Sequence, residues 1–342
     1  MTAVRLTSVG VAHPDHRFRQ EDAGSMAELV GVNRRKTEIL AHNSHITTRA
    51  TAIPPAELPA LGSIELRNDL YRQIAPELSC KAVGLALASQ TYGEMGCLVT
   101  SSCTGYSIPG WAVDLVDTFA FPPTTVRVPI TESGCAGGAV AIARVADYLR
   151  SRPGQSGLAV ATELCSLSFR PMFDEGTLLS SIVFGDGSGA ALLQTGRGEG
   201  LEIIDSLSFL IPDSKGDLGF DLTDLGFHPV LSRELAEVLT PSTEVAVDRL
   251  LSRNGLETSD VDAWLLHPGG PRILKAIEAR LNVSQEKTQW SWSSMLEFGN
   301  TSSAAIFDVL FRYLEERPAD HTWAVLAAFG PGVSIELLLL RS

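Results

Sequence analysis

The sequence predicts an α/β protein made of two copies of one unit, in which mixed sheets enclose buried helices. Gly134–Cys135 and Gly299–Asn300 each open a run that ends in Tyr-Leu and then Arg-Pro, and the two runs lie 165 positions apart throughout. Residues 136–150 and 301–316 have helical patterns that are apolar almost all round, which is typical of helices buried between layers. Short apolar runs at 158–162 and 323–328 follow these helices and predict alternating strands.

The repeat also predicts where the two halves lie. We expect an N-terminal half at 1–195 that carries the reactive cysteine, and a C-terminal half at 196–342 that carries a histidine and an asparagine. A second pair of similar stretches, which begin at Phe184 and Phe329, lies only 145 positions apart, so the first half contains extra residues within 165–183. Segment 15–75 is more polar and is predicted to be a helical cap rather than a separate domain.

Composition excludes several classes of function. The 342 residues include 27 Lys+Arg and 40 Asp+Glu, and the net charge of −13 argues against nucleic acid and anionic membranes as partners. No apolar run reaches the roughly 18 residues that a membrane helix needs, and the N-terminus lacks the layout of a signal peptide. The five cysteines show no metal-binding spacing. We therefore expect a reduced, cytoplasmic protein without a metal.

Cys135 is the first candidate for chemistry. It follows Gly134 and precedes a buried helix, so helix N–H groups should face its sulfur, lower the pKa of the thiol and favour a nucleophilic thiolate. The alternative is a small, buried, inert cysteine, which is the commoner fate of this residue. Asn300 at the matched position of the other copy favours the nucleophile, because both residues would then face a shared axis.

His267 ends the apolar run 261–266 and is followed by a Pro-Gly-Gly-Pro loop and a helical pattern at 272–281. The offset places it opposite Ser102, although a core histidine remains the alternative. Asn300 is expected to be the N-cap of its helix, and its amide can also face a developing oxyanion. A Cys–His–Asn set suits transfer of an acyl group to the thiol, followed by decarboxylation of a malonyl unit whose enolate His267 and Asn300 would stabilise.

The motifs resemble those of type III polyketide synthases, the chalcone-synthase-like branch of the thiolase superfamily, and bacterial members in particular. The stretches that carry the resemblance are Gly134-Cys-Ala-Gly-Gly138, Phe184-Gly-Asp-Gly187, His267-Pro-Gly-Gly-Pro271, Gly299-Asn-Thr-Ser-Ser303 and Gly330-Pro-Gly332. The resemblance implies a thiolase-like, five-layered αβαβα subunit and a homodimer. It also implies an acyltransferase that extends an acyl-CoA starter with malonyl-CoA, without a cofactor, and cyclises a short polyketide.

The resemblance assigns roles to individual residues. Cys135 is the nucleophile, His267 and Asn300 are the decarboxylation pair, and Phe184 and Phe227 are gatekeepers between the entry tunnel and the cavity. The further residues that it places along the cavity are Cys103, Cys165, Leu167, Ser168, Ser302 and Phe220. A phenylalanine at 220 would make the cavity smaller than in many plant members. The tip of the loop at Ile108–Pro109 would enter the partner's cavity, and a cis bond there is a hypothesis.

One motif departs from the family. Of the cations that grip the phosphates of CoA, only Lys36 matches, while Ile39 and Asn43 replace the others. Arg34, Arg35 and Arg49 could compensate, and the alternative for each is a solvated surface charge. The carrier is therefore left open between CoA and an acyl carrier protein. Two other hypotheses remain: a single-step ketosynthase or acyltransferase of the ketoacyl-ACP synthase III type, and a noncatalytic partner subunit. The His-Pro-Gly-Gly-Pro loop speaks against the former, whose loop usually reads His-Gln-Ala-Asn.

Overall fold

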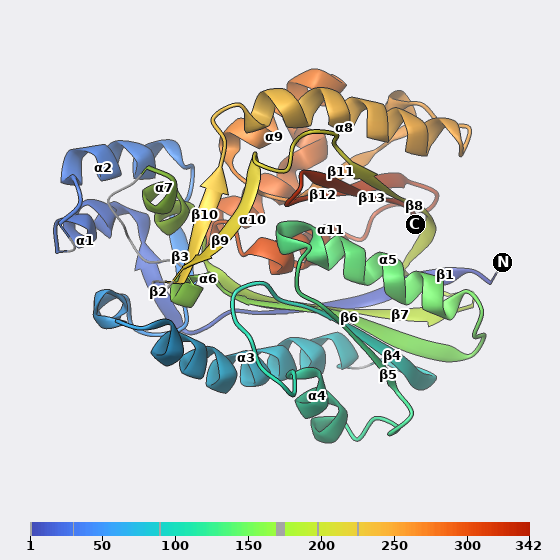
Figure 1. Cartoon of the computed structure of the whole chain (residues 1–342). Coiled ribbons are helices and arrows are strands. Elements are labelled where there is room, and N and C mark those ends of the chain that lie inside the picture. The colour runs from blue at the N-terminus through green and yellow to red at the C-terminus, as the bar shows by residue number, and fades with distance from the viewer. Residues whose placement is uncertain (1, 30, 89, 169–174, 197, 224–225) are drawn as a thin grey trace.

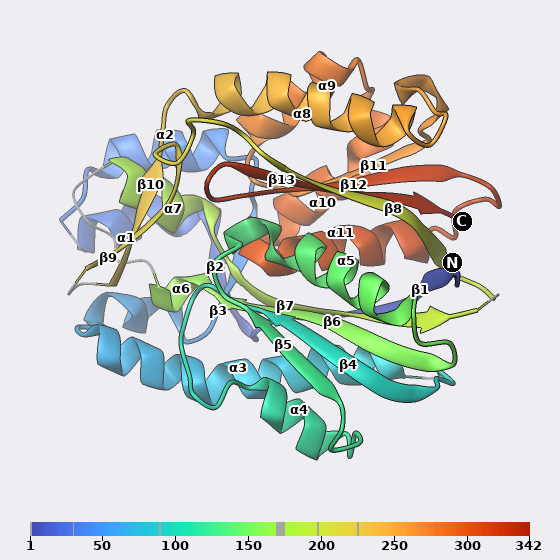
Figure 2. The same cartoon turned by 45° about the vertical axis from the view of Figure 1, so that its right-hand side comes forward.

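The computed structural model describes residues 2–29, 31–88, 90–168, 175–196, 198–223 and 226–342. These described residues stack in five layers, in the order helices, sheet, helices, sheet, helices, as Figures 1 and 2 show from two directions. The predicted αβαβα architecture is therefore confirmed. Among the same residues, no helix combines the length and the apolar character needed to cross a membrane.

The sheet of the N-terminal half lies between the central helices and an outer layer. Its strands, in spatial order, are β5 (Val126–Ile130), β4 (Glu94–Ser101), β6 (Gln155–Leu164), β7 (Asp186–Thr195) and β1 (Val4–Ala12). β4 runs parallel to β5 and β6, whereas β7 is antiparallel to β6 and β1, so the sheet is mixed as predicted. The outer layer here consists of α3 (Ile64–Leu87) and α4 (Ala112–Thr118).

The sheet of the C-terminal half repeats this arrangement. Its strands are β11 (Ala263–Leu266), β12 (Trp323–Gly330), β13 (Ser334–Arg341) and β8 (Leu201–Leu210), and the outer helices are α8 (Leu235–Ser252) and α9 (Pro271–Leu281). A short antiparallel ladder between β1 and β8 joins the two sheets, with Arg5 opposite Glu202 and Leu6 opposite Leu201.

Helices of both copies form the central layer. The 3-10 turn η3 (Gly134–Ala136) leads into α5 (Gly137–Leu149), and η6 (Ser302–Ala304) leads into α11 (Ala305–Glu315), beside η5 (Gln285–Thr288) and α10 (Gln289–Phe298). Buried side chains of α5 and α11 share one apolar core with both sheets. α5 begins and ends within one residue of the predicted range, because its apolar faces have a sheet on each side. α11 ends within one residue of its predicted range but begins four residues late, because η6 forms the first turn.

The remaining elements gather at one end of the molecule, on the left in Figure 1. They are β2 (His16–Arg19), η1 (Gln20–Asp22), α1 (Ala23–Leu29), α2 (Arg34–Asn43), β3 (Thr48–Thr51), η2 (Pro55–Ala60), α6 (Cys165–Ser168), α7 (Glu175–Val183), β9 (Leu218–Thr223) and β10 (Gly226–Leu231), while η4 (Thr258–Asp260) precedes β11. The purely helical cap predicted for 15–75 is wrong in part, because β2 pairs antiparallel with β3. Phe18 of β2 is buried against the Arg49 guanidinium of β3, 4.7 Å away, which stabilises the extended pairing.

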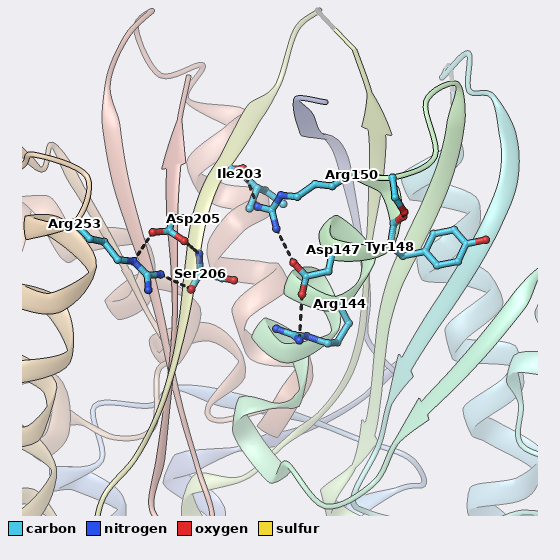
Figure 3. A network of polar contacts seen from close by, with 9 residues as sticks. Arg144, Asp147, Tyr148, Arg150, Ile203, Asp205, Ser206 and Arg253 are labelled. Carbon is cyan, nitrogen blue, oxygen red and sulfur yellow. Dashed lines mark hydrogen bonds and ion pairs between the residues drawn. The ribbon is translucent and has the colours of Figure 1, made fainter. Parts of the chain in front are cut away.

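Polar contacts also attach the central helix α5 to the second half. The Arg150 guanidinium donates to Asp147 Oδ1 at 2.6 Å and to the Ile203 carbonyl of β8 at 3.4 Å (Figure 3). On the other side of β8, Arg253 donates to Asp205 Oδ2 at 2.5 Å, so the strand is held from two directions.

We expect Gly138→Ala to destabilise the fold, because an added Cβ would lie 2.2 Å from the Ser303 carbonyl oxygen and 2.8 Å from Ile306 Cγ2 of the facing helix. Overpacking of this kind typically costs about 1–3 kcal/mol. Urea unfolding followed by circular dichroism measures the change.

Gly84→Ala in α3 is the matched control for this prediction. Its added Cβ would have only the Phe119 ring as a neighbour, at 3.9 Å. Because alanine is the better helix former by about 0.5–1 kcal/mol, this variant should be slightly stabilised. Equal stability of Gly138→Ala and the unaltered chain would contradict the close packing of α5 on α11.

Candidate active site

The backbone around Cys135 is enclosed by both halves. Gly134 has φ +49°, and a Cβ there would lie 2.7 Å from the Pro331 ring. A Cβ on Gly137 would lie 2.0 Å from Ser101 Oγ at the end of β4. Only glycine satisfies the positive φ and the close approach together, so the glycines on either side of Cys135 fix its place at the start of α5.

The sulfur of Cys135 faces polar side chains of the C-terminal half. Its thiol donates to Ser302 Oγ at 3.6 Å, and the Asn300 side chain also hydrogen-bonds it. Burial nevertheless raises the pKa of Cys135 to about 12, against the opposite effect of these two hydrogen bonds. The expected lowering of the thiol pKa by the helix start is therefore not what the structure shows. Removing water from a lone charge outweighs the local dipoles here.

His267 directly follows β11 and is 2% exposed. Its backbone N–H donates to the Ala327 carbonyl of β12 at 2.8 Å, and Gly269 N–H donates to the His267 carbonyl at 2.8 Å. Neither ring nitrogen has a hydrogen-bond partner among the described residues, and burial lowers the pKa of the ring to about 4. A core histidine normally satisfies its ring nitrogens, so this neutral, unpaired imidazole favours a role in binding or catalysis.

Asn300 lies where the two motif loops meet. Its N–H donates to the Val183 carbonyl at 2.9 Å, and its carbonyl accepts from Gly185 N–H at 3.0 Å, which forms a parallel bridge with Phe184. Its Oδ1 accepts from Ser302 N–H at 2.8 Å. The expectation that Asn300 is the N-cap of its helix is wrong. The N-cap residue of η6 is Thr301, because the 3-10 turn begins two residues after Asn300.

Strand β12 contacts both His267 and the turn that holds Cys135. The backbone of His267 is bonded to β12 at Ala327, and the last residue of this strand, Gly330, contacts the turn that holds Cys135. A Cβ on Gly330 would lie 2.6 Å from the Ser133 carbonyl and 2.8 Å from Ala136 Cβ. One end of one strand therefore borders both residues, while Ser302 of η6 and Asn300, two residues before it, reach the same sulfur.

Sequence reasoning missed Glu163, which lies fully buried at the end of β6. Its carboxyl group accepts from Thr104 Oγ1 at 2.8 Å and from Cys103 N–H at 3.1 Å on the first half, and from Ser302 Oγ at 3.3 Å on the second. Ser303 Oγ also donates to it. Burial raises the pKa of Glu163, while these donors oppose the rise. The signal in the sequence was a lone acidic residue within the apolar run of β6.

Two predicted cavity residues belong to this network. Cys103 Sγ lies 3.5 Å from Glu163 Oε1 and 3.5 Å from Ser302 Oγ. Ser302 therefore lies between the sulfurs of Cys103 and Cys135 and also bonds Glu163. The polar network reaches the candidate nucleophile through this hydroxyl group.

The predicted gatekeepers lie on neighbouring elements. Phe184 follows α7, and the Arg49 guanidinium donates to its carbonyl at 2.7 Å. Phe227 lies on β10, which packs against α7. Phe220 of β9 contacts Phe227 edge-on, with the ring centroids 6.3 Å apart. Arg49 itself is buried and bound to backbone carbonyls, so it cannot compensate for the cations missing at the expected CoA site.

The residues predicted for the cavity floor divide into three environments. Cys165 and Phe184 line a cavity of about 110 Å³ that α1, α2, η2 and α7 help to enclose. None of the described residues that line it is Cys135, His267 or Asn300. Leu167 packs into the apolar core beneath α3, and the Ser168 hydroxyl donates to the Thr104 carbonyl at 2.6 Å. Their contact with substrate stays a prediction.

The candidate CoA residues lie on the exposed face of α2. Arg34 forms ion pairs with Glu28 at 3.3 Å and Glu38 at 2.8 Å, whereas Arg35 and Lys36 are exposed beside it. The described residues include no group of His, Cys, Asp and Glu close enough together to hold a metal ion. The bond between Ile108 and Pro109 is cis, and Ile108 is 79% exposed at the tip of its loop.

Comparisons with known proteins agree with this geometry. The model of the N-terminal domain of chalcone and stilbene synthases matches residues 6–197, and that of their C-terminal domain matches residues 202–342. The chain is 30% identical over 341 residues to the 1,3,6,8-tetrahydroxynaphthalene synthase of Streptomyces coelicolor, covering 98% of this chain and 91% of that protein. It is 28% identical to the phloroglucinol synthase of Pseudomonas fluorescens, with 96% of each chain covered.

Solved structures show the same relationship. The crystal structure of the Streptomyces coelicolor enzyme, a bacterial type III polyketide synthase, matches with a TM-score of 0.92 at 30% identity, over 98% of this chain and 99% of that one. A synthase from the brown alga Ectocarpus siliculosus matches with a TM-score of 0.91 at 24% identity, which supports the fold alone. From the two domain matches and the shared fold, the chain belongs to the chalcone and stilbene synthase family and is a type III polyketide synthase, a condensing acyltransferase.

Proposed function

We propose that this enzyme loads an acyl starter on Cys135, extends it with malonyl-CoA and cyclises a short polyketide. The observation that carries the proposal is the convergence on one sulfur of the Ser302 and Asn300 side chains, next to the strand end that holds the unpaired ring of His267. A single-step synthase that uses a carrier protein gains no support, because the relatives named above are chain-extending enzymes by name.

Loading begins from a neutral pair. With the pKa of Cys135 raised to about 12 and that of His267 lowered to about 4, neither group is charged at pH 7 when considered alone. Moving the proton from the thiol to the imidazole creates opposite charges together, so each offsets the burial cost of the other. The thiolate then attacks the thioester carbonyl, the bond from that carbonyl to the carrier sulfur breaks, and the leaving thiolate takes the proton back from His267.

Extension uses the same side chains as hydrogen-bond donors. As CO2 leaves the malonyl thioester, its electron pair moves onto the thioester oxygen to form an enolate. A neutral imidazole still has one N–H, and an amide has two, so His267 and Asn300 can both donate to that oxygen. The enolate carbon attacks the acyl group on Cys135, a carbon–carbon bond forms and the thiolate is released. An asparagine suits this step because a carboxylate would repel the enolate.

Substrate delivery and assembly are part of the proposal. CoA is the proposed carrier, gripped by Lys36 and Arg35 of α2, with no further cofactor in a cytoplasmic enzyme. A homodimer is supported by the exposed apolar edge of β5, where Val126 and Val128 are 42% and 40% exposed, and by Ile108 at its loop tip. The relatives' names include aromatic products, so we expect pyrones or phenols as products.

A panel of starter acyl-CoA thioesters with malonyl-CoA tests the function directly. The unaltered enzyme should release CO2 and yield multiply extended products that mass spectrometry identifies, and Cys135→Ala should abolish the extended products because no acyl group can be loaded. Cys80→Ala is the matched control, because Cys80 lies on the outer helix α3 and bonds Thr118 there. Full condensation activity in Cys135→Ala would refute the mechanism, and only singly extended products would favour the single-step synthase.

Alkylation of Cys135 by iodoacetamide tests the paired proton transfer. His267→Gln removes the proton acceptor, so the paired charges cannot form and the thiolate arises only by titration of Cys135 at its raised pKa of about 12. Each unit of increase lowers the thiolate fraction about tenfold. We expect alkylation at pH 7 at least roughly tenfold slower than in the unaltered enzyme, with a rate that still rises above pH 9.

Peptide mapping by mass spectrometry separates Cys135 from Cys103, which lies in the same network. Identical pH profiles for His267→Gln and the unaltered enzyme would show that His267 does not take the proton.

A further inference from the structure

One face of the outer helix α3 holds the segments that surround Glu163. Asn68 and Tyr71 are one turn apart on this helix. Asn68 Nδ2 donates to the Tyr106 carbonyl at 2.9 Å, and its Oδ1 accepts from Tyr106 N–H at 2.8 Å. Arg67, on the same face, donates to the Leu167 and Ser168 carbonyls of α6. The helix therefore braces both the loop that follows β4 and the segment that follows Glu163.

Tyr71 lies at the centre of this brace. It is 2% exposed, and a Cβ on Gly105 would lie 2.1 Å from its ring, so the loop after β4 packs directly on the aromatic face. Its hydroxyl accepts from Trp111 Nε1 at 3.1 Å and donates to Ser102 Oγ at 2.8 Å. Tyr71 thus contacts the beginning, the middle and the end of the loop between Ser102 and Trp111.

These hydrogen bonds have one possible direction. An indole N–H can only donate, so the Tyr71 oxygen accepts from Trp111 and its proton points to Ser102. The Ser102 hydroxyl then donates to Glu163 Oε2 at 3.4 Å. The hydroxyl groups of Tyr71 and Ser102 therefore both point toward Glu163. From Glu163 the network continues through Ser302 to Cys135.

We propose that Tyr71 is a positioning residue for condensation: through Ser102 its hydroxyl holds Glu163 in the orientation that keeps Ser302 at the Cys135 sulfur. The inference rests on the proposed function of Cys135. Tyr71 touches no reacting atom and acts through other residues. Tyr71 lies on α3 in the outer layer, so it supports the site from outside the set of catalytic residues.

The alternative is a purely structural tyrosine, and the competing expectations are distinct. A structural role predicts a loss of stability with turnover per folded molecule unchanged. A positioning role predicts a lower kcat with little change in KM, because Tyr71 contacts the loop after β4, whereas the proposed carrier residues Arg35 and Lys36 lie on the exposed face of α2.

Tyr71→Phe tests the proposal, because it keeps the ring that packs on Gly105 and removes only the hydroxyl group. We expect a kcat roughly tenfold lower, as for the loss of supporting hydrogen bonds in other sites, and a KM for malonyl-CoA within about twofold. Tyr313→Phe is the matched control. Tyr313 is 3% exposed and its hydroxyl lies 3.4 Å from Thr322 Oγ1 at the far end of α11, so its loss should leave kcat unchanged.

A double-mutant cycle with Ser102→Ala shows whether the effect passes through Ser102. If it does, the double variant is about as impaired as either single variant, because both break one chain of hydrogen bonds. If the losses of kcat in the two single variants multiply to a roughly hundredfold loss in the double variant, the proposal is overturned. A kcat for Tyr71→Phe within twofold of that of an active unaltered enzyme also overturns it. Trp111→Phe, which removes the donor at the other end, gives the same reading if Tyr71→Phe folds poorly. An unaltered enzyme that is itself inactive would refute the proposed function instead.

Discussion

The close contact between the two central helix starts is the constraint on which the site depends. Gly138 of α5 lies against the Ser303 carbonyl and Ile306, and Gly137 lies against Ser101. A side chain at Gly138 would push α5 away from α11, and one at Gly137 would push it away from the end of β4. That separation would take Ser302 away from the Cys135 sulfur, because these atoms are carried by the turns that open the same two helices.

Burial at this contact sets the electrostatics of the site. Cys135, His267 and Glu163 all lose water, so the charged form of each becomes costly. Glu163 is compensated by donors from both halves, whereas His267 has none among the described residues. The donors of the network thus bind the Glu163 carboxyl group, and the His267 imidazole remains available to a substrate. Reactivity at neutral pH then depends on charges that form as a pair rather than singly.

Much of the fold was predictable because it follows from local patterns. The repeat and the all-round apolar helices predicted both copies of the helix–strand unit. α5 lies within one residue of its expected range, whereas α11 begins four residues late because the 3-10 turn η6 comes first. The pairing of β2 with β3 was missed, since these strands have four residues each and their periodicity is too short to detect. The direction of the shift in the Cys135 pKa was also predicted wrongly, because burial of the thiol depends on both sheets and not on the helix that follows the cysteine.

Residues that act at a distance were harder to predict than those in motifs. Glu163 contacts Cys103 and Thr104 from about sixty positions away in the chain, and Tyr71 contacts Ser102 and Trp111 from 31 and 40 positions away. Hydrogen bonds between such segments leave no spacing pattern in a single sequence. The one available signal was compositional: an acidic side chain inside an apolar strand requires donors, and those donors had to come from elsewhere in the fold.

The repeat explains why chemistry and support are divided between the halves. The 165-residue offset matches Ser102 to His267 and Glu163 to Ala328. In the first copy the matched pair is joined by a hydrogen bond at 3.4 Å, and its members hold the loop and the network in place. In the second copy the residue matched to Glu163 is Ala328, whose methyl group cannot accept a hydrogen bond. Both ring nitrogens of His267 are unpaired among the described residues, and burial lowers the pKa of the ring, so this copy keeps a neutral imidazole for chemistry.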